Sequence, residues 1–155
     1  MPEDVANVTR LDINIHTGTH IDAPRHFIEG GATIEKVPLS KCNGDAVLFK
    51  AEGEPEGQEI GLEEVKNSGI EVSPGDIFIL QSGIQNLKGD KQYYEEFPTP
   101  SIKLLNWLLE SGVKCDATDG PSVDSLASET YEKHKLLLSE GVPVVENLAN
   151  LDALP

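Results

Sequence analysis

Hydrophobic and polar residues alternate from Leu11 to His16, which is the pattern of a β-strand with one buried face. Such a strand would bury Leu11, Ile13 and Ile15 and would leave the side chain of His16 on the polar face at the strand's end. Apolar runs later in the chain predict four more strands, over Ala46–Ala51, Asp76–Gln81, Val113–Ala117 and Val142–Glu146.

Helical spacing of apolar residues is clearest over Ser101–Ser111, between Pro100 and Gly112, which favour the start and the end of a helix. A short helix is predicted over Leu62–Asn67 and a second long helix over Ser128–Ser139. Because strands and helices follow one another in mixed order, the pattern predicts an α/β fold.

The chain has 155 residues, of which 38% are hydrophobic, and is therefore long enough to bury one core. An acidic loop with glycine and proline is predicted over Glu52–Glu59, but no linker, internal repeat or low-complexity segment divides the sequence. We therefore expect a single domain over residues 1–155.

The formal net charge of −15 leaves no basic patch that could attract phosphate, so we expect neither nucleic acid nor anionic membranes as partners. The two cysteines, Cys42 and Cys115, lack a C-x-x-C spacing and predict neither a disulfide framework nor a thiolate metal site. No apolar run reaches membrane-spanning length, and the N-terminus does not read as a leader, so the expected location is cytoplasmic.

Candidate chemistry is concentrated in the segment 16–26, which holds three of the chain's four histidines and an aspartate. Imidazole and carboxylate groups are the ligands that hold catalytic divalent transition metals. Gly18 permits a turn after the predicted strand, and His20 and Asp22 would then project to one side of an extended segment. This spacing predicts part of a metal site, and the alternative is a solvated loop that happens to be rich in histidine.

The end of this segment carries a further candidate, His26. Pro24 holds the backbone of Ala23 out of the helical region, so we expect the chain to remain extended toward His26.

The segment resembles the H-x-G-T-H-x-D-x-P-x-H signature of the cyclase-like metal-dependent hydrolases, the family that includes bacterial kynurenine formamidase (arylformamidase) and isatin hydrolase. The matching positions are His16, Gly18, Thr19, His20, Asp22, Pro24 and His26. The stretches Thr118–Asp124, His134–Leu138 and Glu146–Leu148 also resemble this family. The resemblance implies the family's swivelling β/β/α domain, with a mixed sheet and flanking helices.

The resemblance also implies a set of metal ligands. By position, His16, His20 and Asp22 would bind one ion, and Asp22 would bridge to a second ion held with His134 and Glu146. Some family members hold one ion and not two. We expect Zn²⁺ as the metal, with Mn²⁺ as an alternative, since mixed nitrogen and oxygen ligands suit both.

The sequence around the two distant ligands leaves other roles open. His134 falls at helical spacing with Tyr131, Leu137 and Leu138, and a histidine on an apolar stripe is commonly a hydrogen-bonded core residue. Glu146 follows an apolar run, where an unpaired buried carboxylate is costly and a metal would remove that cost. The alternative for Glu146 is a side chain that simply reaches solvent.

The resemblance implies hydrolysis of an amide, an aryl formamide or a cyclic amide, by a metal-activated water, with His26 as the catalytic acid/base. One alternative is a lactone, ester or other cyclic-substrate hydrolase with the same centre. Another is a truncated metal-binding domain without turnover, although metal binding alone would not need His26. The expected partners are a small-molecule substrate and further copies of the chain, in a homodimer or homotetramer. Relative to the family the chain is short at both ends, which leaves the pairing of the sheet's edge open.

Several polar residues near these motifs have ambiguous roles. Thr19 and Ser122 could orient ligands or could cap the local backbone, and Asp119 and Asp124 are open in the same way. Trp107 lies on a helix's apolar stripe and is expected in the core, so no cage for an aromatic substrate is evident.

Overall fold

The computed structural model describes residues 6–51 and 58–154. The predicted loop Glu52–Glu59 falls almost entirely outside the described residues, and its last residue opens the short strand β3 (Glu59–Ile60).

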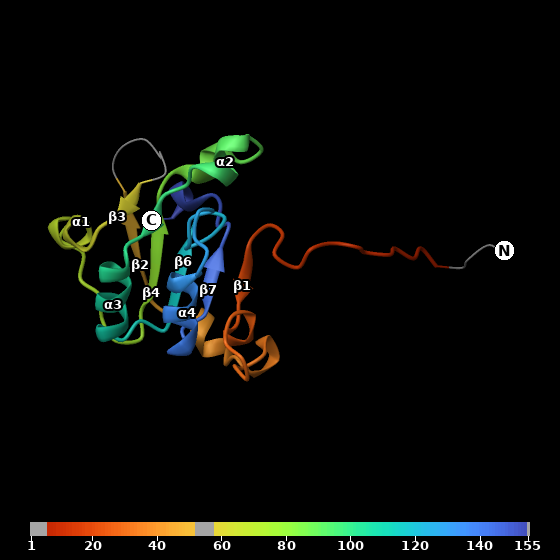
Figure 1. Cartoon of the computed structure of the whole chain (residues 1–155), viewed down its shortest axis with the longest axis horizontal. Coiled ribbons are helices and arrows are strands. Elements are labelled where there is room, and N and C mark those ends of the chain that lie inside the picture. The colour runs from red at the N-terminus through yellow and green to blue at the C-terminus, as the bar shows by residue number, and fades with distance from the viewer. Residues whose placement is uncertain (1–5, 52–57, 155) are drawn as a thin grey trace.

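A five-stranded mixed sheet forms the centre of the fold, in the order β1-β7-β6-β4-β2 (Figure 1). Four strands are parallel and β1 pairs antiparallel with β7. The strands are β1 (His20–Asp22), β2 (Ala46–Lys50), β4 (Ile77–Gln81), β6 (Cys115–Thr118) and β7 (Val144–Glu146). All four residues of β6 are buried, as expected for a central strand covered on both faces.

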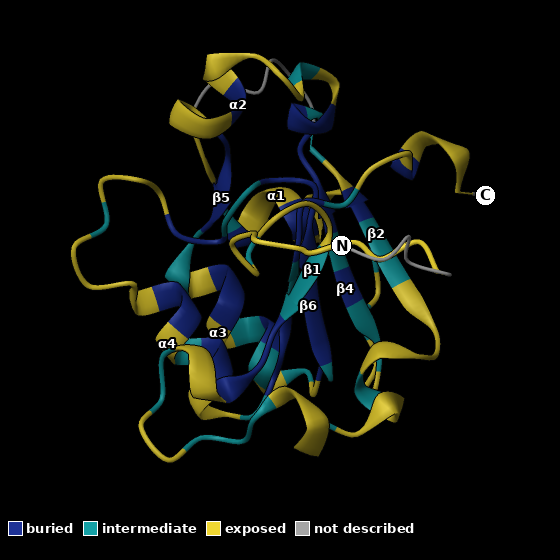
Figure 2. Ribbon diagram, turned by 90° about the vertical axis from the view of Figure 1, so that its right-hand side faces the viewer, coloured by how far each residue is buried: buried dark blue, intermediate teal, exposed yellow. Residues whose placement is uncertain are grey.

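Helices pack against this sheet and enclose the hydrophobic core. Figure 2 shows α3 and α4 side by side, with their buried residues turned toward the buried strands. Phe78 and Leu80 of β4 are buried with Leu105 and Leu108 of α3 and Leu137 of α4. The predicted α/β class is therefore confirmed, with a mixed sheet and flanking helices. The helices are α1 (Leu62–Asn67), α2 (Lys91–Glu95), α3 (Ile102–Glu110) and α4 (Glu132–Ser139).

Smaller elements complete the connections. β3 pairs in parallel with β5 (Thr99–Pro100). Short 3₁₀ turns lie at Pro24–His26, Ile34–Lys36, Leu39–Cys42, Ile84–Leu87 and Leu151–Ala153.

The three predicted helices, which correspond to α1, α3 and α4, and the last four predicted strands lie where the apolar pattern places them, with differences at their ends, whereas α2 was not predicted. The side chain of Ser101 caps α3 by accepting a hydrogen bond from the backbone N–H of Leu104 at 3.1 Å. Trp107 is half-buried and packs against the core. The helix predicted from Ser128 begins only at Glu132, because Tyr131 adopts a left-handed backbone with φ 50°.

The prediction of a strand over Leu11–His16 is wrong. Residues 6–15 form no strand and extend away from the domain (Figure 1). Leu11, Ile13 and Ile15 are 77%, 65% and 80% exposed. Alternation creates a face that could be buried, but a strand also needs a neighbouring backbone. Here β1 pairs only as far as His20 opposite Glu146, and the next residue of the partner segment, Asn147, turns away with φ 60°.

Both cysteines are free, with Cys42 exposed and Cys115 buried, so no disulfide joins them. Burial, together with the adjacent Cys42 thiol, raises the pKa of Cys115 to about 12, which keeps its thiol protonated. Among the described residues, no helix has the length and apolar character needed to cross a membrane.

Candidate metal centre

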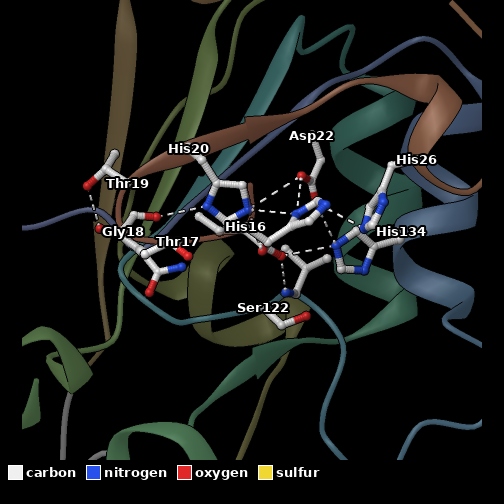
Figure 3. A network of polar contacts seen from close by, with 12 residues as sticks. His16, Thr17, Gly18, Thr19, His20, Asp22, His26, Ser122 and His134 are labelled. Carbon is white, nitrogen blue, oxygen red and sulfur yellow. Dashed lines mark hydrogen bonds and ion pairs between the residues drawn. The ribbon is translucent and has the colours of Figure 1, made fainter. Parts of the chain in front are cut away.

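The six predicted site residues come together where β1, β7 and α4 meet. Antiparallel pairing sets His20 opposite Glu146 and Asp22 opposite Val144, so the two carboxylate-bearing strands lie side by side. The third element, α4, brings a buried histidine to the same place. The residues are Glu146 and the five that Figure 3 labels, namely His16, His20, Asp22, His26 and His134.

Asp22 lies at the centre of the cluster, between imidazole groups on two sides (Figure 3). Its Oδ1 atom is 3.0 Å from Nδ1 of His16 and 3.5 Å from Nε2 of His20. Its Oδ2 atom is 3.4 Å from Nε2 of His134 and 3.7 Å from Nε2 of His26. One carboxylate that faces four imidazoles has the placement that a bridging ligand needs.

Glu146 is the last residue of β7 and is only 4% exposed, so its side chain does not simply reach solvent. Its Oε1 atom lies 3.0 Å from Nε2 of His134 and accepts a hydrogen bond from the backbone N–H of Val123 at 3.1 Å. The other carboxylate oxygen, Oε2, lies 3.7 Å from Nε2 of His20. Glu146 thus contacts a histidine from β1 and the histidine from α4.

The turn before β1 orients His20. Gly18 has φ 69°, a left-handed conformation that glycine adopts without strain, and its carbonyl oxygen lies 2.8 Å from Nδ1 of His20. Because a carbonyl oxygen can only accept, Nδ1 carries the proton and Nε2 faces the carboxylates. The Thr19 hydroxyl donates to the carbonyl oxygen of Asn147 at 2.7 Å, which ties this turn to the end of β7. Thr19 therefore anchors the turn.

The backbone around Pro24 differs in part from the sequence prediction. Ala23 is extended, with ψ 158°, as expected before proline, but the chain then turns into the 3₁₀ segment Pro24–His26. Proline favours the first position of such a turn because its φ is already close to the required value. The turn folds His26 back toward Asp22, and the ring centroids of His26 and His16 are 4.2 Å apart.

Charge balance in the cluster depends on burial and on the facing groups. Burial would raise the pKa of Asp22, but the adjacent His134, His26 and His16 outweigh it and lower the pKa. Burial would lower the pKa of His134, but the carboxylates of Asp124, Asp22 and Glu146 outweigh it and raise the pKa to about 11. The carboxylates therefore favour a positive charge among them. In this structure the protonated imidazole of His134 carries that charge.

The donor set fits a divalent cation. Both oxygens of Asp22 and the Nε2 atom of His134 are buried without a hydrogen-bond partner among the described residues. His134 Nε2 is close to Glu146 but lacks hydrogen-bond geometry, so that pairing is a contact of charges. Buried polar atoms without partners are costly, and coordination of a metal ion would satisfy them.

An open cavity of about 520 Å³ borders the cluster, a size that suits a small organic molecule. His16, His20, Asp22 and His26 of the cluster line part of it. The rest is lined by Ile15, Ile21, Ala23, Arg25, Thr33, Ile34 and Glu35.

Sequence reasoning missed an aromatic pair beside the histidines. Phe27 stacks on Tyr131 with ring centroids 5.0 Å apart, and its ring lies 4.2 Å from that of His26 and 4.8 Å from that of His134. The one available signal was that Phe27 directly follows the signature's last histidine. Phe27 therefore packs against both imidazoles.

The two ambiguous aspartates have different surroundings. Asp119 is fully buried and accepts hydrogen bonds from the backbone of Ser82 and Gly83 at 2.9 and 2.8 Å, so it holds the turn after β4. Asp124 lies 2.7 Å from Nδ1 of His134 and thus belongs to the cluster's surroundings. Burial would raise the pKa of Asp124, but the hydrogen bonds from His134 and Lys133 outweigh it and lower the pKa. The Ser122 hydroxyl caps the local backbone by accepting from the N–H of Asp124 at 3.2 Å.

Comparison with curated proteins gives relatives of one kind. The chain is 29% identical to a kynurenine formamidase of Erythrobacter litoralis over 149 residues, which cover 96% of this chain and 65% of the relative. It is 28% identical to a kynurenine formamidase of Bordetella petrii, with 95% and 68% covered. The chain thus spans about two thirds of the length of the curated relatives that it matches.

Solved structures agree in fold. A potential metal-dependent hydrolase with cyclase activity aligns with TM-score 0.79 and 28% identity, covering 94% of this chain and 68% of the other. Isatin hydrolase A from Labrenzia aggregata aligns with TM-score 0.80 over 93% of this chain and 64% of its own, and its 22% identity shows the shared fold alone. The family model "Putative cyclase" matches residues 2–125, well over half of the chain. This chain therefore belongs to the cyclase family, the family that its histidine-rich signature resembles.

Proposed function

We propose that this chain carries the centre of a metal-dependent amidohydrolase that cleaves an aryl formamide or a cyclic amide. The observation that carries the proposal is the position of Asp22, whose two buried oxygens face four imidazoles and lack hydrogen-bond partners among the described residues. The kynurenine formamidases similar to this chain support an amide as the substrate. An open cavity beside the same residues offers room for it.

The proposed ligands divide into two sets that share one aspartate. His16, His20 and Asp22 would hold one divalent cation, and Asp22 with His134 and Glu146 would hold a second. We propose Zn²⁺, with Mn²⁺ as the alternative, since nitrogen and oxygen donors suit both. When bound, such a cation supplies Lewis-acid chemistry, which acidifies water and polarises a carbonyl oxygen.

His26 is proposed as the catalytic residue that moves the proton. Burial, more than any neighbouring charge, lowers its pKa below 6.5, so its imidazole is neutral near pH 7 and can accept a proton from water. Water adds to the amide carbonyl carbon, the carbon–nitrogen bond breaks, and His26 returns the proton to the departing nitrogen. The side chain of His26 is 32% exposed and borders the cavity, where it can reach a substrate.

The geometry also supports a different use of His26, as a metal ligand. Nitrogen and oxygen atoms of His16, Asp22 and His26 lie within 4.8 Å of one another, and so do those of His20, Asp22 and Glu146. The two roles make different predictions for metal content. If His26 is a ligand, its removal would release metal, whereas a proton carrier can be removed with the metal retained.

Turnover with and without metal tests the proposal. Protein treated with a chelator and reloaded with Zn²⁺ or Mn²⁺ should hydrolyse formanilide or a cyclic amide such as isatin, while the chelated protein should not. Faster cleavage of a simple ester or a lactone than of either amide would favour the alternative hydrolase with the same centre. Stoichiometric metal without turnover on any of these substrates would favour a metal-binding domain.

We also propose that the chain assembles into a homodimer or homotetramer and is located in the cytoplasm. The exposed apolar residues Leu11, Ile13 and Ile15 recur at every second position, and exposed apolar surface that is grouped in this way supports association with another chain. Light scattering tests the assembly, because a mass of one chain would contradict it. The free cysteines support a reducing compartment, and cell fractionation tests the location.

A further inference from the structure

Asp124 joins three groups of the α4 region through one buried carboxylate. It is 2% exposed and lies in the loop between β6 and α4, ten positions before His134 in the sequence. Its Oδ2 atom is 2.7 Å from Nδ1 of His134 and also accepts the backbone N–H of His134 at 3.0 Å. Its Oδ1 atom accepts the backbone N–H of Lys133 at 3.2 Å.

The backbone contacts explain how α4 begins. Tyr131 stands at the start of the helix with a left-handed backbone and provides no side-chain cap. The first N–H groups of a helix have no partner within the helix and need an acceptor from elsewhere. Asp124 supplies this acceptor for Lys133 and His134, so the same carboxylate fixes both the start of α4 and the ring of His134.

The side-chain contact fixes which nitrogen of His134 faces the metal cluster. An ionised carboxylate can only accept, so a hydrogen bond to Asp124 requires a proton on Nδ1. The opposite nitrogen, Nε2, lies 3.0 Å from Oε1 of Glu146 and 3.4 Å from Oδ2 of Asp22. With Nδ1 committed to Asp124, Nε2 is the atom that would donate an electron pair to a cation held between it and these carboxylates.

We infer that Asp124 is a positioning residue that presents His134 to the metal centre in its Nδ1–H tautomer. The inference rests on the metal centre proposed above. Histidine ligands commonly donate their second N–H to a carboxylate, which fixes the ring and makes the ligating nitrogen more basic. Asp124 occupies that place for His134 and couples it to the start of the helix.

A neutral amide at position 124 cannot both accept the N–H groups at the start of α4 and accept the Nδ1–H of His134. Asn has one acceptor oxygen and one NH₂ donor, so in either orientation it directs the NH₂ at an N–H group of Lys133 or of His134. Asp124→Asn should therefore reduce Zn²⁺ affinity by roughly 10- to 100-fold, the usual effect of losing such a carboxylate partner. The readout is Zn²⁺ affinity measured by competition with a chromophoric chelator.

Asp119→Asn is the matched control. Asp119 is also a buried carboxylate that accepts several hydrogen bonds, but it holds the turn after β4 and does not contact His134. This variant should lose thermal stability and keep its Zn²⁺ affinity within about 3-fold, well under the effect expected at Asp124. Parallel losses of affinity in the two variants would reduce Asp124 to a structural role and overturn the inference.

A measurement on the unaltered chain covers the case in which Asp124→Asn fails to fold. In ¹⁵N-labelled, Zn²⁺-loaded protein, His134 should show a protonated Nδ1 that exchanges slowly with water and an Nε2 shifted by the metal. A metal-bound Nδ1 would overturn the inference, as would unchanged affinity in Asp124→Asn. Absence of Zn²⁺ binding by the wild-type protein would instead overturn the proposed metal centre and this role together.

Discussion

The substitution Asp22→Asn should abolish most of the stabilisation that metal binding gives to the fold. Asp22 is 2% exposed and its carboxylate faces His16, His20, His26 and His134, so Asp22→Asn removes the negative charge that lies between the four imidazoles. A ligand present at 100 times its dissociation constant stabilises the native state by about 2.7 kcal/mol. In a chain of 155 residues this corresponds to a rise in Tm of roughly 5 to 11 °C for one ion. Asp22→Asn should show little of this rise.

The assay is thermal unfolding with chelator and with Zn²⁺ for each protein, and the quantity compared is the difference in Tm between the two conditions. This difference cancels any change that the substitution makes to the metal-free fold. Asp12→Asn is the matched control, because Asp12 is exposed and lies outside the cluster. It should retain the full metal-dependent rise. A rise in Asp22→Asn equal to that of wild type would refute the reasoning that Asp22 binds the metal.

Three further predictions concern catalysis, pH and packing. His26→Ala should retain metal, by elemental analysis, yet lose roughly 10²- to 10⁴-fold in turnover, the usual contribution of an acid/base group; metal loss would make His26 a ligand. Burial raises the pKa of Asp116 to about 8, so the stability it contributes below its unfolded pKa is lost as pH rises through about 8. Urea unfolding at about pH 9 should therefore find Asp116→Asn more stable than wild type by over about 1 kcal/mol, with no such gain near pH 4, and equal stability at both would contradict this. Leu105→Ala should cost about 2 to 5 kcal/mol of unfolding free energy, because Leu105 is fully buried between α3 and the sheet, and a cost under 1 kcal/mol would contradict this packing.

The apolar patterns predicted most helices and strands correctly, because the apolar face of each is covered by neighbouring elements in the fold. The apolar runs of β4 and β7 and the apolar stripe of α3 match covered faces, so sequence and packing agree there. The alternation at Leu11–His16 is equally regular, but the segment pairs with no strand among the described residues 6–51 and 58–154. Pairing partners are a property of the whole fold, and local alternation carries no information about them.

The sequence predicted which residues make up the candidate site, but it did not predict the hydrogen bonds that hold them in place. The spacing of His16, His20 and Asp22 is readable in one segment, and the resemblance of two later stretches to the family extends the set to His134 and Glu146. Asp124 was left ambiguous, because its hydrogen bond to His134 depends on where the loop before α4 folds back. Its role follows from tertiary contacts that no spacing in the sequence encodes.

Anomalous diffraction at the zinc edge, from crystals of the Zn²⁺-loaded protein, tests the central claim most directly. The account predicts one or two peaks within the cluster, with nitrogen or oxygen atoms of Asp22 and its neighbouring ligands about 2.0 to 2.2 Å from an ion. Two peaks would be about 3.5 to 4 Å apart and bridged by Asp22. Stoichiometric zinc that lies elsewhere on the chain, with Asp22, His134 and Glu146 free of metal, would contradict the account.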